Sequence, residues 1–310
     1  MKIAKKILLA LLLTFTAAAI IIYPERYIAK CFQGFVMWAE CVLPSLFPFM
    51  VICAIFIKTG IAEKSALPLK KITGFLRLPQ AAAPLFIMSV FSGYPVGARS
   101  VAEYCENGNV GKRDAFKLSV LCSTSGPLFI IGSVGVNMFK DKTAGWRIML
   151  AHAISVIVIA IIISLFSKSE NKTYVNFKNR NGNVLYDAFY GAVISIALAG
   201  GFIAFFCVFA QIAYDFYLLY PLEKFLELFF DNTTAEGVVN GIVEVTTGCR
   251  KLSASDGRFC VPLAGFLITF GGVSILAQQL CYLLKAKVSA LKFILVKFLQ
   301  AVLCFCLLLI

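Results

Sequence analysis

Four short polar motifs interrupt apolar stretches of the sequence. They read Ser92-Gly-Tyr-Pro-Val-Gly-Ala-Arg99, Ser123-Thr-Ser-Gly-Pro127, Val243-Glu-Val-Thr-Thr-Gly248 and Gly271-Gly-Val-Ser274. Their hydroxyls, carboxylate and exposed backbone groups could hold a polar solute. Catalysis would need a nucleophile beside a base, a set of metal ligands or a phosphate loop, and the sequence contains none of these patterns. We therefore predict a binding site, and we expect no enzyme, no cofactor and no metal.

The composition indicates a protein dissolved mainly in lipid. Of the 310 residues, 60% are hydrophobic and 15% are charged, which is far from the balance of a soluble domain. The net charge of +13 comes from Lys and Arg in short clusters between apolar runs, where they set topology, so we expect no nucleic-acid partner. The eleven cysteines show no metal-binding spacing, and several lie inside apolar runs as small hydrophobes.

About 20 mostly apolar residues cross a bilayer, and this rule predicts about seven transmembrane helices. We place them at 7–23, 32–57, 118–139, 146–166, 188–218, 259–284 and 288–310. The first also resembles a signal peptide, but its apolar run continues without a convincing cleavage site, which favours a retained helix. Segments 79–108 and 235–255 are apolar over only part of their length, which predicts two re-entrant helical hairpins.

The order of elements is the same in both halves of the chain. Each half has a long helix, a hairpin, an interrupted helix and a plain helix, and three crossings per half would turn the second half over in the membrane. This predicts an inverted repeat, whose broken helices form a substrate site near the midplane. We predict an N-terminal helix at 1–30, repeats at 31–166 and 187–310, and a cytoplasmic linker at 167–186.

Charge predicts a cytoplasmic N-terminus, because the Lys- and Arg-rich segments 58–77, 99–117, 168–180 and 285–287 then lie inside. The acidic loop at 220–231 lies outside. Arg250, Lys251 and Arg258 are exceptions, since this topology also places them outside.

Non-helical backbone at membrane depth survives only around protein or a water-filled cavity. Gly93 and Gly97 allow a turn, and Pro95 can begin a returning helix whose free N–H groups favour an anion. A single break would more simply reflect close packing of small residues, but matching breaks in two halves favour a shared site. The predicted substrate-binding residues are Ser92, Gly93, Tyr94, Arg99, Ser123, Thr124, Ser125, Glu244, Thr246, Thr247, Gly272, Ser274 and Gln278.

Ionisable residues inside the apolar runs have competing interpretations. Inserting a carboxylate at the centre of a transmembrane helix costs about 2.5–3.5 kcal/mol or more, which usually marks a functional residue. We therefore assign Glu244 to proton or cation coupling or to solute contact. The alternative is a structural carboxylate that is paired with a nearby Lys or Arg or is held neutral. Glu40 is expected near the interface, and His152 is expected to pack or to lie at the interface. Lys292 and Lys297 are expected to snorkel to the membrane surface.

Several motifs resemble the YlbJ (SpoVV) family of sporulation integral membrane proteins. They are Leu43-Pro-Ser-Leu-Phe-Pro-Phe49, Ser92–Ala98, Thr124–Ile130 and Phe270–Ser274, followed by Ala277-Gln278. The resemblance implies nucleoside-recognition (Gate) domains, similar to the core of concentrative nucleoside transporters. It also implies dipicolinate transport during endospore formation. Gly126 stands where the resemblance leads us to expect Asn, and the loss of that amide bears on the identity of the solute and not on the fold.

These observations predict an all-α, multi-pass transporter of a small anionic or nucleoside-like solute in the bacterial cell membrane. The resemblance places it in the mother-cell-derived membrane around the forespore. We expect a carboxylate solute, drawn in by Arg99 or Lys117, and a coupling proton or sodium ion. The bilayer is the surrounding partner, and the sequence leaves a homo-oligomer open. The alternative is a membrane scaffold or assembly factor for sporulation that transports nothing.

Overall fold

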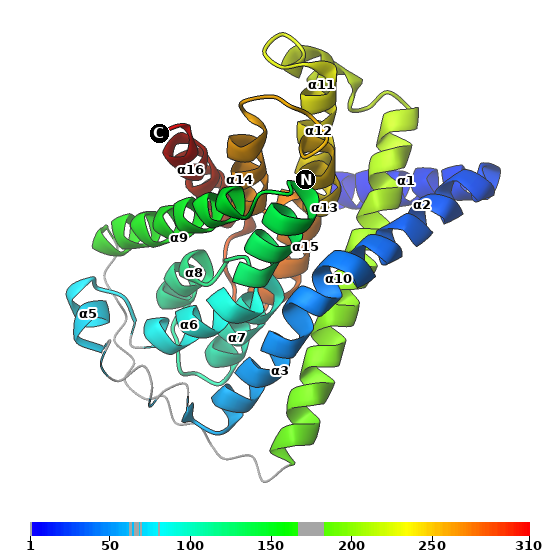
Figure 1. The fold of residues 1–310 in the computed structure, drawn as a ribbon. Helices are drawn as coiled ribbons and strands as arrows, with labels where there is room; N and C mark the ends of the chain where they lie inside the picture. The colour runs from blue at the N-terminus through cyan, green and yellow to red at the C-terminus, as the bar shows by residue number, and fades with distance from the viewer. Residues whose placement is uncertain (1, 62–63, 65–67, 69, 80, 167–182) are drawn as a thin grey trace.

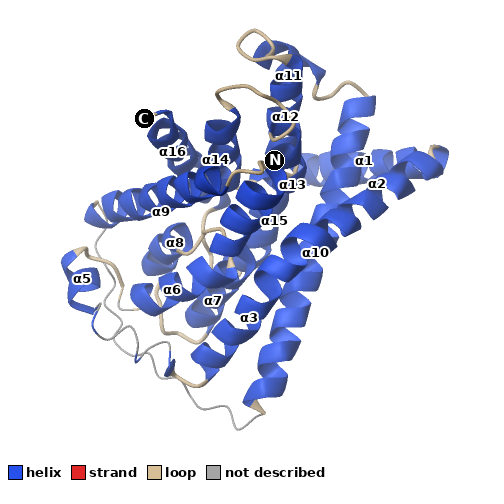
Figure 2. Ribbon diagram, in the orientation of Figure 1, coloured by secondary structure: helices blue, strands red, loops and turns tan. Residues whose placement is uncertain are grey.

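The computed structural model describes residues 2–61, 64, 68, 70–79, 81–166 and 183–310, and within them the chain is helical without a strand (Figures 1 and 2). The predicted all-α architecture is confirmed. The element order is given by α1 (Lys2–Ile22), α2 (Pro24–Met37), η1 (Trp38–Val42), α3 (Leu43–Lys58), α5 (Lys70–Phe75), α6 (Ala82–Ser92), α7 (Tyr94–Glu106), α8 (Lys112–Leu121), η3 (Leu128–Met138), α9 (Lys142–Leu165), α10 (Val184–Asp215), α11 (Tyr220–Leu226), α12 (Asn232–Val243), α13 (Val245–Leu252), α14 (Cys260–Phe270), α15 (Gly272–Leu283) and α16 (Ala290–Leu309).

Five helical segments of the described chain are long and apolar enough to cross a membrane. They are Pro24–Lys58, Lys142–Leu165, Val184–Asp215, Cys260–Leu283 and Ala290–Leu309. Two predicted crossings differ from them. Ala10–Ile22, the continuously described apolar part of α1, is shorter than these five segments, and segment 118–139 is two helices, α8 and η3, separated by the break at 122–127. The exact number of seven crossings therefore stays a prediction.

The long segment α2–η1–α3 contains a wide π-type turn because of its prolines. Pro44 has no N–H to return to the preceding turn, and the helix widens at η1, immediately before it. The Cys41 carbonyl in that turn accepts hydrogen bonds from the hydroxyls of Ser45 and Ser133, both at 2.7 Å. Ser133 belongs to η3, so the widened turn also joins α3 to the first broken helix.

Both predicted hairpin segments fold as two short antiparallel helices. α6 and α7 meet at Gly93, whose φ of +78° suits glycine, and α12 and α13 meet at Glu244 in extended conformation. A Cβ on Gly97 would lie 2.1 Å from the Cys122 carbonyl oxygen, and one on Gly248 would lie 2.2 Å from the Gly241 Cα. At about 1.5 Å per residue, none of these helices spans the roughly 30 Å hydrocarbon core.

Each helix break lies against the hairpin tip of its own half. A Cβ on Gly126, in the first break, would be 3.4 Å from the Phe91 carbonyl oxygen at the first tip. In the second break, one on Gly272 would be 2.8 Å from the Gly241 carbonyl oxygen. Neither place has room for a side chain, because the Leu46 side chain and the Phe91 carbonyl crowd Gly126 and backbone carbonyls crowd Gly272.

The two hairpins enter from opposite ends of the molecule, and α10 marks those ends. Near its start, Asp187 pairs with Lys58 at 3.2 Å, and the Gly191 carbonyl accepts from Arg99 of α7 at 3.2 Å. At its other end, Asp215 pairs with Arg26, and the chain continues through α11 to the second hairpin. This opposition is the relation that an inverted repeat requires.

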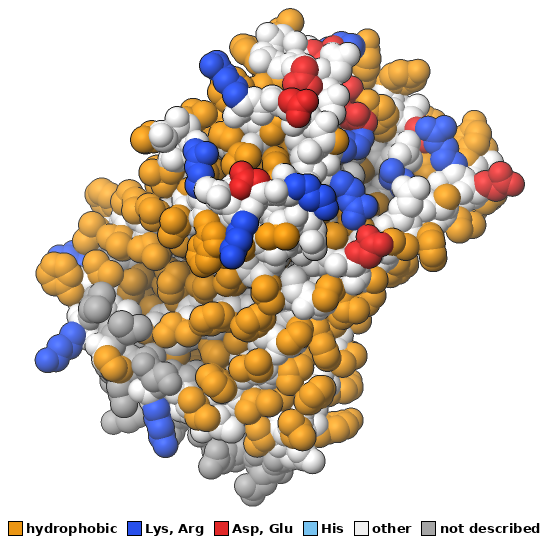
Figure 3. Space-filling view, in the orientation of Figure 1, with side chains coloured by type: hydrophobic (Ala, Val, Ile, Leu, Met, Phe, Trp, Pro, Cys, Tyr) orange, Lys and Arg blue, Asp and Glu red, His pale blue; other side chains and the backbone are white. Residues whose placement is uncertain are grey.

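The three basic residues that the predicted topology places outside have local partners at the end of the molecule where α10 finishes. Arg250 lies 3.5 Å from Glu40, and Lys251 pairs with Glu236, so these cations add little net charge there. Arg258 lies over the ring of Phe259, 4.5 Å from its centre. Glu40 has an exposed side chain, as expected near an interface. Figure 3 shows charged side chains gathered at the top of the view and a broad hydrophobic surface below.

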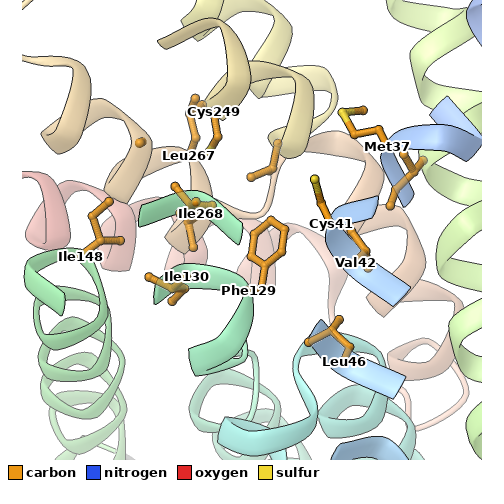
Figure 4. Packing of buried hydrophobic residues seen from close by; sticks show 14 of the residues in the cluster. Met37, Cys41, Val42, Leu46, Phe129, Ile130, Ile148, Cys249, Leu267 and Ile268 are labelled. Atoms are coloured by element: carbon orange, nitrogen blue, oxygen red, sulfur yellow. The ribbon is translucent and has the colours of Figure 1, made fainter. Parts of the chain in front are cut away.

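The two predicted repeats share one core. Side chains from α2–η1–α3, η3, α9, α13 and α14 meet in one cluster, with Phe129 and Ile130 of the first half near Leu267 and Ile268 of the second (Figure 4). The Tyr94 hydroxyl also donates to the Ile268 carbonyl. The predicted boundary at 30/31 falls inside α2, and α10 begins at Val184, within the predicted linker 167–186. Residues 167–182 of that linker lie outside the described residues.

The topology predicts the side from which single cysteines react. On a cysteine-free background, a membrane-impermeant maleimide should label Lys287→Cys only after the cytoplasmic face is exposed, and Phe229→Cys in intact cells. Labelling of both positions from the same face would contradict opposite locations for these loops and remove the inverted repeat.

The packing predicts that Gly97→Ala destabilises the protein by roughly 1–3 kcal/mol, because its Cβ would overlap the Cys122 carbonyl. Gly201→Ala on α10 is the matched control, since its Cβ would meet no atom within 4 Å. Thermal unfolding in detergent measures both. Equal melting temperatures for the two variants would show that the contact at Gly97 is not tight.

Candidate functional site

A small cavity of about 40 Å³ lies where the two hairpin tips and the two helix breaks meet. Seven predicted site residues line it, namely Gly93, Tyr94, Ser125, Glu244, Thr246, Ser274 and Gln278. Seven further lining residues were not predicted, namely Val42, Leu46, Gly126, Phe129, Ala199, Ile203 and Ile275. The last group is mostly apolar and comes partly from η1, α3 and α10, so the long helices close the sides of the cavity.

Glu244 is the buried carboxylate of the cavity. It accepts hydrogen bonds from the backbone N–H groups of Thr246 at 3.0 Å and Thr247 at 2.7 Å, and from the Thr247 hydroxyl at 2.9 Å. Within the described chain, no Lys or Arg lies within 4 Å of it. The positive end of α13 therefore stabilises this carboxylate in place of a counter-charge.

The first hairpin tip also turns at one residue, but with a different backbone conformation and a different cap. Gly93 occupies the N-cap of α7 and has no side chain to accept from the first N–H groups of that helix; because Pro95 has no N–H, the uncapped donors are those of Tyr94 and Val96. Across the cavity, the buried Gln278 amide nitrogen has no hydrogen-bond partner within the described residues. The first half thus presents free N–H donors where the second half presents a carboxylate.

Three residues that the site prediction left out hold the first break from behind. The backbone N–H of Ser125 donates to His152 Nε2 at 3.1 Å, and His152 Nδ1 lies 2.9 Å from the Thr269 hydroxyl. From α16, Lys297 donates to the Ser123 carbonyl at 2.9 Å and Gln300 to the Val120 carbonyl at 3.1 Å. Of the two positions expected for His152, the structure shows the packed one.

The snorkelling prediction for Lys297 is wrong. Its side chain is fully buried and points inward to the break, whereas Lys292 on the same helix is exposed. The break explains the difference, because its carbonyls supply an acceptor at membrane depth. A helix face that reads as apolar with one lysine gives no sign of an acceptor on another helix, so the sequence alone could not have found it.

The other predicted residues support the cavity and do not line it. Ser92 and Thr124 donate their hydroxyls to the carbonyls of Met88 at 2.5 Å and Ser89 at 3.3 Å. Thr247 donates its N–H and hydroxyl to Glu244, Ser123 is buried in the first break, and Gly272 packs against the second hairpin. These positions fix the backbone of the tips and breaks.

Arg99 lies in a separate cleft of about 340 Å³ between α3, α7 and α10. Its Nε donates to Glu103 at 2.8 Å, and its Nη1 to the Ser195 hydroxyl at 3.2 Å. Lys58 and Asp187 also line this cleft, at the end predicted to be cytoplasmic. Lys117, the alternative residue for attracting an anion, does not line the cleft and is buried beside Asp114 at 3.7 Å.

Comparison with known proteins shows one similar protein whose family the motifs resemble. No family model matches the chain, and no solved structure matches it. The sporulation integral membrane protein YlbJ of Bacillus subtilis (strain 168) is 26% identical over 326 aligned residues, covering 96% of this chain and 80% of YlbJ. This similarity confirms the resemblance to the YlbJ family. The chain is a multi-pass membrane protein, and the relative is a sporulation integral membrane protein.

The motifs that suggested YlbJ now have places in the structure. Leu43–Phe49 follows the π-type turn at η1, and Ser92–Ala98 forms the first hairpin tip. Thr124–Ile130 covers the first break and the start of η3, and Phe270–Ser274 covers the second break. Most of the YlbJ-like motifs therefore surround the cavity.

The cap geometry predicts that Glu244→Ala destabilises the protein by about 0.5–2 kcal/mol, because two N–H groups of α13 lose their acceptor. Glu244→Gln should lose less, since the Gln carbonyl can still accept. Thermal unfolding in detergent measures both, with Gly201→Ala as the neutral reference. Unchanged stability in Glu244→Ala would mean that the carboxylate does not hold α13.

Proposed function

We propose that this protein is a membrane transporter of a small carboxylate, with the cavity between the hairpin tips as its solute site. The observation that carries the proposal is the meeting of two oppositely entering hairpins and two broken helices at one small, partly polar cavity. Broken helices in lipid are stable only around such a space, and inverted-repeat transporters place their substrate there. A scaffold would require neither the breaks nor the free donors.

The donors in the cavity favour an anionic solute. The start of α7 offers uncapped N–H groups, and Gln278 offers an amide without a partner. Tyr94 presents an aromatic ring against which a planar solute could stack. Dipicolinate, a planar aromatic dicarboxylate, has this chemistry and is the solute implied by the resemblance to YlbJ.

The small volume of the cavity supports a gating role for its two hairpins. A space of about 40 Å³ holds a few water molecules, whereas pockets for ring-sized ligands usually measure about 300–1,000 Å³. The hairpins must therefore separate before a solute enters. The cleft around Arg99 borders the first hairpin and the same faces of α3 and α10, and it provides an approach from the end that we expect to be cytoplasmic.

Glu244 is suited to coupling transport to a cation. Its carboxylate lines the cavity and has no basic partner among the described residues, so a proton or a sodium ion could neutralise it. The helix start at α13 supports the charged form when the cation leaves. The coupling would then use the carboxylate on one side of the cavity while the solute uses the donors on the other.

The proposal predicts uptake of dipicolinate by proteoliposomes that contain the purified protein. Ser125→Ala should weaken apparent affinity by roughly fivefold, about 1 kcal/mol for one lost hydrogen bond, and Gly93→Val should abolish uptake because its φ is closed to a β-branched residue. Ser119→Ala is the matched control. Among the residues that the structure describes, its buried hydroxyl bonds only the Phe116 carbonyl of its own helix.

Nucleosides and other carboxylates in the same assay identify the solute by competition. Wild-type protein that reconstitutes well but binds and moves none of them would favour the scaffold alternative. Normal uptake by folded Gly93→Val, Ser125→Ala and Thr247→Val variants would place the solute site elsewhere in the protein.

A further inference from the structure

A buried lysine, Lys297, lies behind the first-half residues that line the cavity. Lys297 Nζ donates to the Ser123 carbonyl at 2.9 Å and lies 5.6 Å from the centre of the Tyr94 ring. Tyr94 lines the cavity, as does Ser125, two residues beyond Ser123. The ammonium group is therefore separated from the solute space by one layer of atoms.

This charge has no counter-charge nearby. No Asp or Glu of the described chain lies within 4 Å of Lys297, and the groups around it are His152, Tyr94 and Cys304. His152 accepts a backbone N–H through Nε2, which identifies it as a neutral ring in this geometry. Burial without a counter-charge favours the neutral amine of Lys297, so an anion in the adjoining space would favour the ammonium form and gain affinity from it.

Satisfying the free carbonyls at the end of α8 does not explain why a basic residue occupies position 297. Lys297 and Gln300 lie one turn apart on α16, and both donate to carbonyls that α8 leaves free, those of Ser123 and Val120. Gln300 does this with a neutral amide. A second amide would serve the helix end equally well, so the ammonium supplies something beyond a hydrogen bond.

We propose that Lys297 is the residue that makes the cavity select an anion over a neutral molecule of the same shape. The inference rests on the proposed solute-binding role of the cavity. Lys297 acts through its field and through the break that it holds, without touching the solute. Inside a membrane protein this field is poorly screened, so one layer of side chains leaves it effective.

The test compares two ligands of similar shape and different charge. Calorimetric titration of the purified full-length protein measures the affinity for dipicolinate and for its neutral diamide, pyridine-2,6-dicarboxamide. Lys297→Met should weaken dipicolinate binding by about tenfold or more, about 1.4 kcal/mol, and leave diamide binding within about twofold. Lys297→Arg should keep the preference for the anion.

Two controls separate charge from packing. Gln300→Leu removes the equivalent hydrogen bond without a charge, so it should change the affinity for both ligands by the same factor. Lys292→Met removes a charge from an exposed position of the same helix and should change neither. If Lys297→Met does not fold, Lys297→Gln keeps a donor for Ser123 and serves for the comparison.

The possible results distinguish this inference from the function that it rests on. Loss of the anion preference in Lys297→Met, with both controls as described, supports the inference. An unchanged preference overturns the role of Lys297 and leaves the transporter proposal standing. Equal wild-type affinity for the two ligands also overturns the role of Lys297, although a solute site remains. Wild-type protein that binds neither ligand overturns both the role of Lys297 and the choice of dipicolinate as the solute.

Discussion

The structure depends on one constraint, which is that backbone N–H and C=O groups outside a helix must find partners at membrane depth. The first break, at 122–127, shows how this is met. Its Ser125 N–H reaches His152 on α9, and carbonyls at and before the break reach Lys297 and Gln300 on α16. Because those partners come from both halves of the chain, the break ties the two predicted repeats into one body.

The two hairpin tips present different groups beside the cavity. Each hairpin turns at a single residue and begins a new helix there. In the second half the side chain of Glu244 caps the new helix, and in the first half Gly93 has no side chain to do so. Lys297 behind the first half and Glu244 in the second extend this asymmetry, so the two predicted repeats give the cavity walls of different chemistry.

The sequence predicted the backbone of the site better than its walls. Glycine, proline and a lone carboxylate in apolar runs are rare enough to mark the turns at Gly93 and Glu244 and the second break. Segment 118–139 was predicted as one interrupted crossing, whereas the interruption is six residues long and separates two helices. Wall residues such as Val42, Leu46 and Ala199 could not be predicted, because an apolar residue in a long helix looks alike whether it faces lipid or a cavity.

The strengths of the contacts decide which parts can move. His152, Lys297 and Gln300 hold the first break through buried hydrogen bonds, whose loss would leave polar groups unsatisfied in a low-dielectric interior. At the mouth, Arg99 joins α7 to α10 through hydrogen bonds to the Gly191 carbonyl and the Ser195 hydroxyl, and its side chain is about one-third exposed, so water can replace these bonds at little cost. The broken helices therefore form the rigid frame. Separating the first hairpin from α10 costs less free energy than opening the broken helices, and it would connect the cavity to the cleft around Arg99.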